Sequence, residues 1–260
     1  MFQKLFHVFS SAWELLVDIP LPKKWATTSE AEESDDRVEL VALAMPVVGL
    51  ILGLAISIVG VLLEALIPST AAAIIFAVLA VTASEFINSG RGFGIFVSSI
   101  FNWTERGRFA DALSELNTDW RTLSGVLPAL AGVFYFGVKL AGFGLVYHFA
   151  TPYWAVAVFT LSFAAQGYLA SAPSVLSGDP ILPIKGQARF HLWLVAAFIM
   201  LGFIANPAAM LISFAVAFTG AVLFRTFCIE TFSGIDSSQI TLFGVWAELA
   251  VLLTGILSYL

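Results

Sequence analysis

Seven stretches of the chain are apolar over a length that suits a membrane-crossing helix. They cover residues 40–67, 69–87, 126–150, 154–176, 190–205, 207–224 and 239–260. A helix needs about 20 mostly apolar residues to cross the hydrocarbon core of a bilayer. The pattern therefore predicts an all-α fold, a polytopic membrane helix bundle with about seven transmembrane helices.

Lysine and arginine residues occur in alternate connections between these stretches. They lie before the first stretch, between the second and third, between the fourth and fifth, and directly after the sixth. The connections near residues 68, 151–153 and 206–207 carry none. By the positive-inside rule, the N-terminus and the longest loop, residues 88–125, are cytoplasmic. We therefore expect a multi-pass protein of the bacterial inner (cytoplasmic) membrane with its N-terminus inside.

The first twenty residues have an amphipathic pattern. Phe2, Leu5, Phe6, Phe9 and Trp13 recur at helical spacing, while polar residues fill the opposite side. The continuous apolar run of a signal peptide is therefore not formed. This pattern predicts a helix over residues 1–20 that lies in the membrane interface. Together with the seven stretches it is expected to form a single integral membrane domain, residues 1–260.

Composition supports the same class of protein. Hydrophobic residues make up 59% of the chain, charged residues only 12%, and the mean hydropathy is +0.93, so much of the surface needs lipid as its solvent. The net charge of −6 comes largely from an acidic segment before the first stretch, which is interpreted as a solvated linker. A single cysteine, Cys228, excludes an intramolecular disulfide. The chain has no basic stripe that would indicate nucleic-acid binding.

Ionisable residues inside apolar stretches are costly in lipid and are treated as functional candidates. Lys139 lies in the middle of the third stretch, among glycines that let a neighbouring helix approach closely. We expect it to face the bundle interior and to reach a carboxylate, either Glu248 or an acid at the loop boundary. A structural ion pair and a ligand-facing role both remain open. His148 and His191 lie near stretch ends without companion ligands, so they are interpreted as interfacial residues.

Several segments follow one another in an order typical of a known family. These are Ile-Pro-Leu-Pro-Lys-Lys-Trp at residues 19–25, Met-Pro-Val-Val-Gly-Leu-Ile-Leu-Gly at 45–53, the loop segment 108–115, Val-Lys-Leu at 138–140, and the terminal helix with Glu248. In this order the chain resembles the cobalamin synthase family. Members are membrane transferases that join adenosylcobinamide-GDP to α-ribazole or its phosphate and release GMP.

The resemblance implies a site and its partners. The implied catalytic residues are Glu115, Lys139 and Glu248. The implied substrate-binding residues are Asn88, Arg91, Arg108, Gln166 and Ser238. Beside the lipid bilayer, the implied partner is a corrinoid nucleotide, the implied cofactor is Mg²⁺, and the oligomeric state is left open.

The chain departs from the family at the metal-binding run. Family members carry Asp-Gly-x-Ala-Asp-x-x-Asp-Gly after the second stretch, and here those three acids fall on Asn88, Gly92 and Ile95. Because Mg²⁺ prefers anionic oxygen ligands in octahedral array, no cage is evident, and Glu85 and Glu115 are the remaining metal candidates. Either the ligands are rearranged or the chain is a catalytically silent paralogue that binds a ligand or partner. We expect little or no Mg²⁺-dependent transfer.

A small membrane transporter is the alternative from another class. Transporters of this size typically show internal repeats and paired interrupted helices near the middle of the membrane. The chain has no evident internal repeat, which favours the transferase family.

Overall fold

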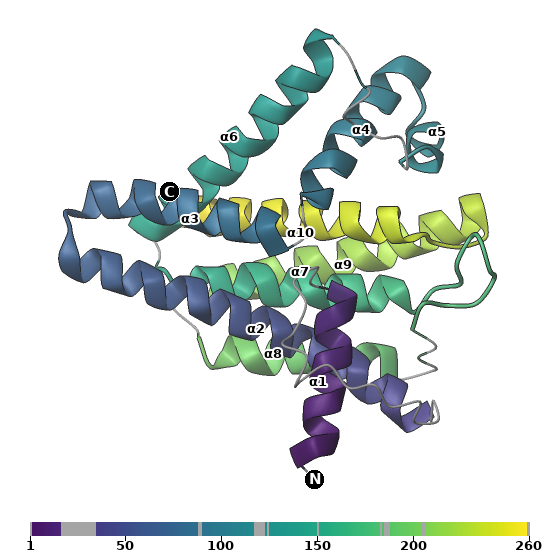
Figure 1. Ribbon diagram of the computed structural model, residues 1–260, viewed down its shortest axis with the longest axis horizontal. Coiled ribbons are helices and arrows are strands. Elements are labelled where there is room, and N and C mark those ends of the chain that lie inside the picture. Colours follow the sequence, from purple (N-terminus) through teal and green to yellow (C-terminus); the bar gives the residue numbers. More distant parts are fainter. Residues whose placement is uncertain are drawn as a thin grey trace.

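The computed structural model describes residues 2–16, 35–87, 90–116, 123, 125–149, 151–182, 184, 188–203 and 206–258. These residues form ten α-helices and one isolated bridge between Pro173 and Pro180 (Figure 1). The helices are α1 (Phe2–Leu16), α2 (Asp35–Leu66), α3 (Ser69–Ile87), α4 (Arg91–Arg106), α5 (Phe109–Ser114), α6 (Val126–Phe149), α7 (Trp154–Ala170), α8 (Ala188–Leu201), α9 (Pro207–Phe232) and α10 (Ser237–Leu257). The predicted all-α membrane bundle is confirmed.

Five helices are long and apolar enough to cross a membrane: α2 from Leu40, α3, α6, α9 and α10. The other two predicted stretches correspond to the shorter apolar helices α7 and α8. The predicted end of the fourth stretch at Leu176 is wrong, because α7 ends at Ala170. A proline follows at position 173, where its ring and missing N–H do not suit a continuing helix, and the chain folds into a loop instead.

Helix α7 lies at the centre of the bundle, and all seventeen of its residues are buried. It packs against α2, α8, α9 and α10. Helix α2 approaches it most closely at Gly49 and Gly53, where an added Cβ would lie 2.5 Å from the Phe159 oxygen and 2.5 Å from the Val156 Cα. The glycines of the 45–53 segment are therefore needed for close packing of two helix backbones.

The amphipathic N-terminal segment forms α1, which crosses α2 (Figure 1). Val8 and Ala12 on its inner side are buried, and Phe9 and Trp13 pack against the core from partly buried positions. The predicted helix is therefore present. The basic and proline-containing segment 19–25 lies outside the described residues, as does most of the acidic linker.

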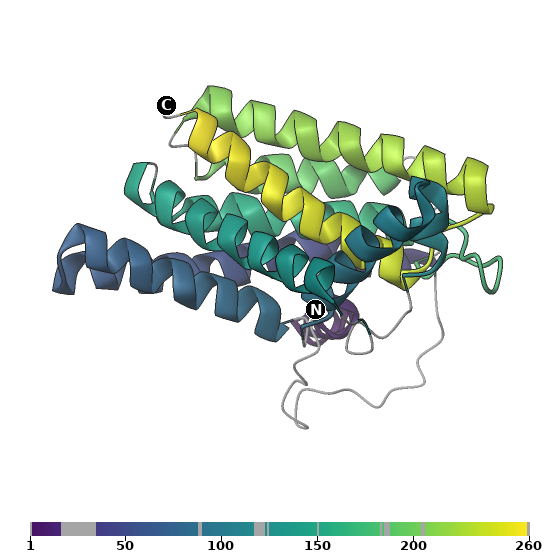
Figure 2. The same cartoon turned by 90° about the horizontal axis from the view of Figure 1, so that it is seen from above.

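The predicted cytoplasmic connections meet at one end of the bundle. Helices α4 and α5 lie beside the first turns of α10 (Figure 2), where Gln239 Nε2 donates to the Leu113 carbonyl at 3.3 Å. The loop after α7 joins them, since the Ile235 N–H donates to the Pro173 carbonyl at 2.7 Å. The loop segment near residue 113, the loop after α7 and the turn between α9 and α10 therefore converge at this end of the bundle.

Candidate functional site

A buried lysine lies between two carboxylates from different helices. Lys139 on α6 is 1% exposed, and its Nζ lies 2.8 Å from Glu85 Oε1 on α3 and 2.8 Å from Glu248 Oε2 on α10. It also donates a hydrogen bond to Ser84 Oγ at 2.8 Å. The prediction that Lys139 faces the bundle interior and reaches a carboxylate is confirmed. We call Lys139, Glu85, Glu248, Ser84 and Tyr135 the lysine cluster.

Ser84 and Tyr135 complete the cluster, and neither was predicted from the sequence. Ser84 Oγ donates to Glu248 Oε2 at 3.2 Å, and the Tyr135 hydroxyl donates to Glu85 Oε1. The Lys139 Nζ also lies 4.9 Å from the centre of the Tyr135 ring. Tyr135 and Lys139 are four residues apart on α6, so they share one face. That spacing was the signal available in the sequence.

Glu85 is the cluster residue at the junction of α3 and α4. Its Oε2 accepts a hydrogen bond from the Phe93 N–H at 3.3 Å, in the first turn of α4. A carboxylate is favourable there because the N-terminal end of a helix carries partial positive charge. The glycine-rich start of α4 carries backbone amides that a phosphate could contact. One of the amides that a phosphate would need already has an acceptor.

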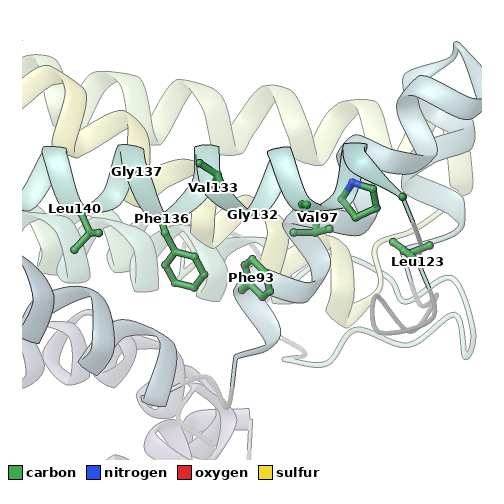
Figure 3. Close-up of a pocket in the computed structure, with 11 residues that line it drawn as sticks. Phe93, Val97, Leu123, Gly132, Val133, Phe136, Gly137 and Leu140 are labelled. Atoms are coloured by element: carbon green, nitrogen blue, oxygen red, sulfur yellow. The ribbon is translucent and has the colours of Figure 1, made fainter.

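Two open grooves on the surface of α6 flank the cluster. One, of about 540 Å³ between α3 and α6, is lined by Glu85 and otherwise mostly by apolar side chains. The other, of about 700 Å³ between α4 and α6, is lined by Phe93, Val97 and further apolar residues (Figure 3). Phe136 and Leu140 line both grooves. The side chain of Glu85 is 15% exposed and that of Glu248 only 3%, so Glu85 is the carboxylate that a groove-bound molecule can reach.

The charges of the cluster define what it can bind. Two carboxylates and one ammonium leave a formal charge of −1 when all three are ionised. The free lone pairs of Glu85 therefore favour a hydrogen-bond donor or a cationic group. Among the described residues, no three His, Cys, Asp or Glu side chains are grouped closely enough to hold a metal ion. The residues of this cluster do not fit the Mg²⁺ that the resemblance implies, because Lys139 occupies the position between its two carboxylates.

Glu115, which was expected to be catalytic or metal-binding, lies elsewhere. Both of its carboxylate oxygens accept from Arg106 Nη2, at 2.7 and 2.8 Å, in an exposed ion pair. The short helix α5 returns over α4, and Asn102 Nδ2 holds the Glu115 carbonyl at 3.1 Å. The structure therefore gives Glu115 a partner in Arg106 and places it outside the lysine cluster.

The expected substrate-binding residues occupy different environments. Gln166 is buried against Gly244, where an added Cβ would lie 2.4 Å from its Nε2, and it donates to Ser162 Oγ at 3.2 Å. Ser238 is buried in the first turn of α10, whereas Arg91 and Arg108 are exposed at the starts of α4 and α5. Asn88 lies outside the described residues. Gln166 therefore serves the contact between α7 and α10 in this structure.

The fold and the cluster define a polytopic α-helical membrane protein with a charged site inside its bundle. The family model of cobalamin-5-phosphate synthase matches residues 8–89, which include α2, α3 and the cluster residues Ser84 and Glu85. Over these residues the chain is similar to that family. No curated protein and no solved structure gives a significant match.

Proposed function

We propose that the chain acts at the adenosylcobinamide-GDP step of cobalamin synthesis, as a ribazoletransferase-like protein of the inner membrane. The observation that carries this proposal is the family match over residues 8–89, which includes Ser84 and Glu85 of the lysine cluster. In the family reaction, a hydroxyl of α-ribazole or its phosphate attacks the phosphorus next to the corrinoid. The bond to the bridging oxygen breaks, GMP leaves, and the hydroxyl proton is released.

The site offers two features that suit such a substrate. Exposed cations, Arg91 and Arg108, lie at the starts of the helices at the loop end of the bundle, where they would attract a diphosphate. The apolar groove beside Glu85 suits a flat, weakly basic ring, because Glu85 can accept a hydrogen bond between apolar walls. Lys139 and Glu248 would hold Glu85 and Tyr135 in place rather than contact the phosphate.

A second version of the function is binding without turnover. It is favoured by the side chains present, because the described residues bring no three carboxylates together and Glu115 is paired with Arg106. Phosphoryl transfer of this class depends on metal ions and cations that neutralise the developing charge. We therefore expect the purified chain to bind the corrinoid nucleotide and to release little or no GMP in a Mg²⁺-dependent manner.

The test incubates the purified protein with adenosylcobinamide-GDP and α-ribazole phosphate, with and without Mg²⁺. Mass spectrometry then follows GMP and the joined corrinoid product. Equal amounts of both products, formed only with Mg²⁺, would establish the transferase and a metal site that the described residues do not provide. Saturable substrate binding without either product would show that the chain binds the corrinoid nucleotide and does not catalyse the transfer. Neither binding nor product would overturn the proposal.

We also propose that the N-terminus and the end of the bundle that carries α4 and α5 face the cytoplasm. The support is the sided distribution of lysine and arginine. A reporter fused after Thr151, at the opposite end of α6, should be found on the periplasmic side. A cytoplasmic reporter at this position would show that the orientation is wrong.

A further inference from the structure

Two arginines meet at the loop end of α8 and α9 without a counter-charge. Arg189 lies in the first turn of α8, and Arg225 lies about two turns before the end of α9. The two guanidinium groups interact as like charges. Within the described parts of the chain, neither forms an ion pair. Helices α7, α8 and α9 together carry one acid, Glu230, which is exposed at the end of α9.

The groups around these arginines are hydrogen-bond donors and aromatic rings. Arg225 lies over the Tyr168 ring, with its Cζ 5.7 Å from the ring centre, and the Trp193 ring is 6.1 Å from that of Tyr168. Arg225 Nε and Trp193 Nε1 are both buried and have no acceptor among the described residues. Trp193 is 3% exposed and lies four residues after Arg189, on the same face of α8.

Buried N–H groups without acceptors are costly, and a protein normally supplies each of them with a partner. Here two such donors lie beside one tyrosine ring, and a second arginine, Arg189, repels the charge of Arg225. A ligand with several acceptor oxygens and negative charge would satisfy the donors and remove the repulsion together. Phosphate oxygens meet both needs, and arginine binds them with particular strength. Basic pockets between helices at the cytoplasmic side of a membrane are a known setting for anionic headgroups.

We propose that Arg225 and Trp193, which lie beside the Tyr168 ring, form together with the neighbouring Arg189 a binding site for a phosphate-type anion at the loop end of α7, α8 and α9. The anion is either the headgroup of an anionic phospholipid or a soluble phosphate. The site is separate from the lysine cluster, and its existence does not depend on the transferase reaction.

The experiment uses the full-length protein in neutral detergent and two sets of ligands. In the lipid arm, native mass spectrometry compares phosphatidylglycerol with phosphatidylcholine. In the soluble arm, thermal unfolding is followed with inorganic pyrophosphate and with chloride at equal ionic strength. Wild-type protein should bind in at least one arm with saturation, and the arm that responds identifies the source of the anion.

The variants show whether the binding belongs to this site. The double variant Arg189→Gln with Arg225→Gln should weaken binding about tenfold or more, because two charge-assisted contacts are lost. Arg106→Gln is the matched control, because it removes an exposed arginine that already has a carboxylate partner in Glu115, and it should leave binding unchanged. Trp193→Phe should also weaken binding, because it removes a buried N–H that has no acceptor among the described residues. Its smaller ring leaves space beside Phe214 and Phe218, so its stability is measured without ligand and its binding is compared at that stability.

If the double variant does not fold, the single variant Arg189→Gln tests whether the anion binds at this site. Within the part of the chain that the structure describes, Arg189 donates to the Ile184 carbonyl alone, at 3.0 Å, so this variant should fold and should bind several-fold more weakly. The proposal is overturned if wild-type protein shows no saturable binding in either arm. It is equally overturned if the arginine variants bind as tightly as wild type.

Discussion

Two cationic centres lie in this bundle, and they differ in how their charge is balanced. Lys139 is enclosed by two carboxylates, a serine and a tyrosine, and its partners come from α3 and α10. Arg225 has an aromatic ring and a second arginine as neighbours, and no acid among the described residues pairs with it. The first centre is complete within the protein, whereas the second has donors left over for a ligand.

The presence or absence of an internal counter-charge distinguishes a structural cation from a ligand-binding cation in a membrane bundle. A cation at membrane depth must be compensated, either by the protein or by something that the protein binds. Removal of a cation that holds internal partners should therefore destabilise the fold. Removal of one without partners should spare the fold and affect binding.

The largest effect is expected for Lys139→Met. It would leave Glu85 and Glu248 buried near each other without a counter-charge, which costs about 3–5 kcal/mol in comparable buried pairs. The free energy of unfolding in detergent measures the loss. The control Lys139→Met with Glu248→Gln should recover part of it, because one uncompensated carboxylate is gone. A wild-type stability for Lys139→Met would show that the cluster is not needed for the fold.

The two carboxylates should differ from each other. Glu248→Gln removes a charged hydrogen-bond acceptor whose side chain is 3% exposed, and should cost about 1.5–3 kcal/mol. Glu85→Gln should cost less, since its side chain is 15% exposed and lines a groove. The same unfolding measurement compares them. The reverse order would mean that the α4 contact of Glu85 matters more to stability than its exposure suggests.

A smaller effect is expected for Tyr135→Phe. The variant keeps the ring beside Lys139 and removes one hydroxyl donor to Glu85, a change worth about 1 kcal/mol. Tyr153→Phe is a matched control, because Tyr153 is exposed and should show almost no change. Equal losses in the two variants would contradict a role for the Tyr135 hydroxyl in the cluster.

The smallest effect on stability is expected for Arg225→Gln. It loses an aromatic contact worth about 0.5–1 kcal/mol, and relief of the repulsion with Arg189 offsets part of that. Unfolding at low and high salt provides the measurement. A loss as large as that of Lys139→Met would reveal a counter-charge for Arg225 and would remove the contrast between the two centres.

The sequence was sufficient to predict those features that follow from the cost of placing a charge in lipid. Lys139 could be assigned a carboxylate partner, and Glu248 could be named, because an unpaired lysine at that depth is unfavourable. The bounds of α3 match the prediction at residues 69 and 87. Uncharged residues are not costly in lipid, so the sequence gave no comparable reason to pair Ser84 or Tyr135 with Lys139. The four-residue spacing of Tyr135 and Lys139 alone did not single out Tyr135.

Other features depended on packing that a single sequence does not reveal. A helix surrounded by other helices and a helix surrounded by lipid are both apolar, so the central position of α7 could not be distinguished. Arg189 and Arg225 were informative only about sidedness. Their meeting depends on the early end of α7 and on how α8 and α9 pack against it. The pairing of Glu115 with Arg106 likewise requires the return of α5 over α4.

The most direct test of the proposed function is the equilibrium binding of adenosylcobinamide-GDP to the full-length protein in lipid nanodiscs. The absorbance of the corrinoid reports the bound fraction, and GMP release is followed in the same sample with Mg²⁺ and α-ribazole phosphate. We predict saturable binding with little or no Mg²⁺-dependent GMP release. Absence of binding, with the protein shown to be folded, would contradict the assignment to this step of cobalamin synthesis.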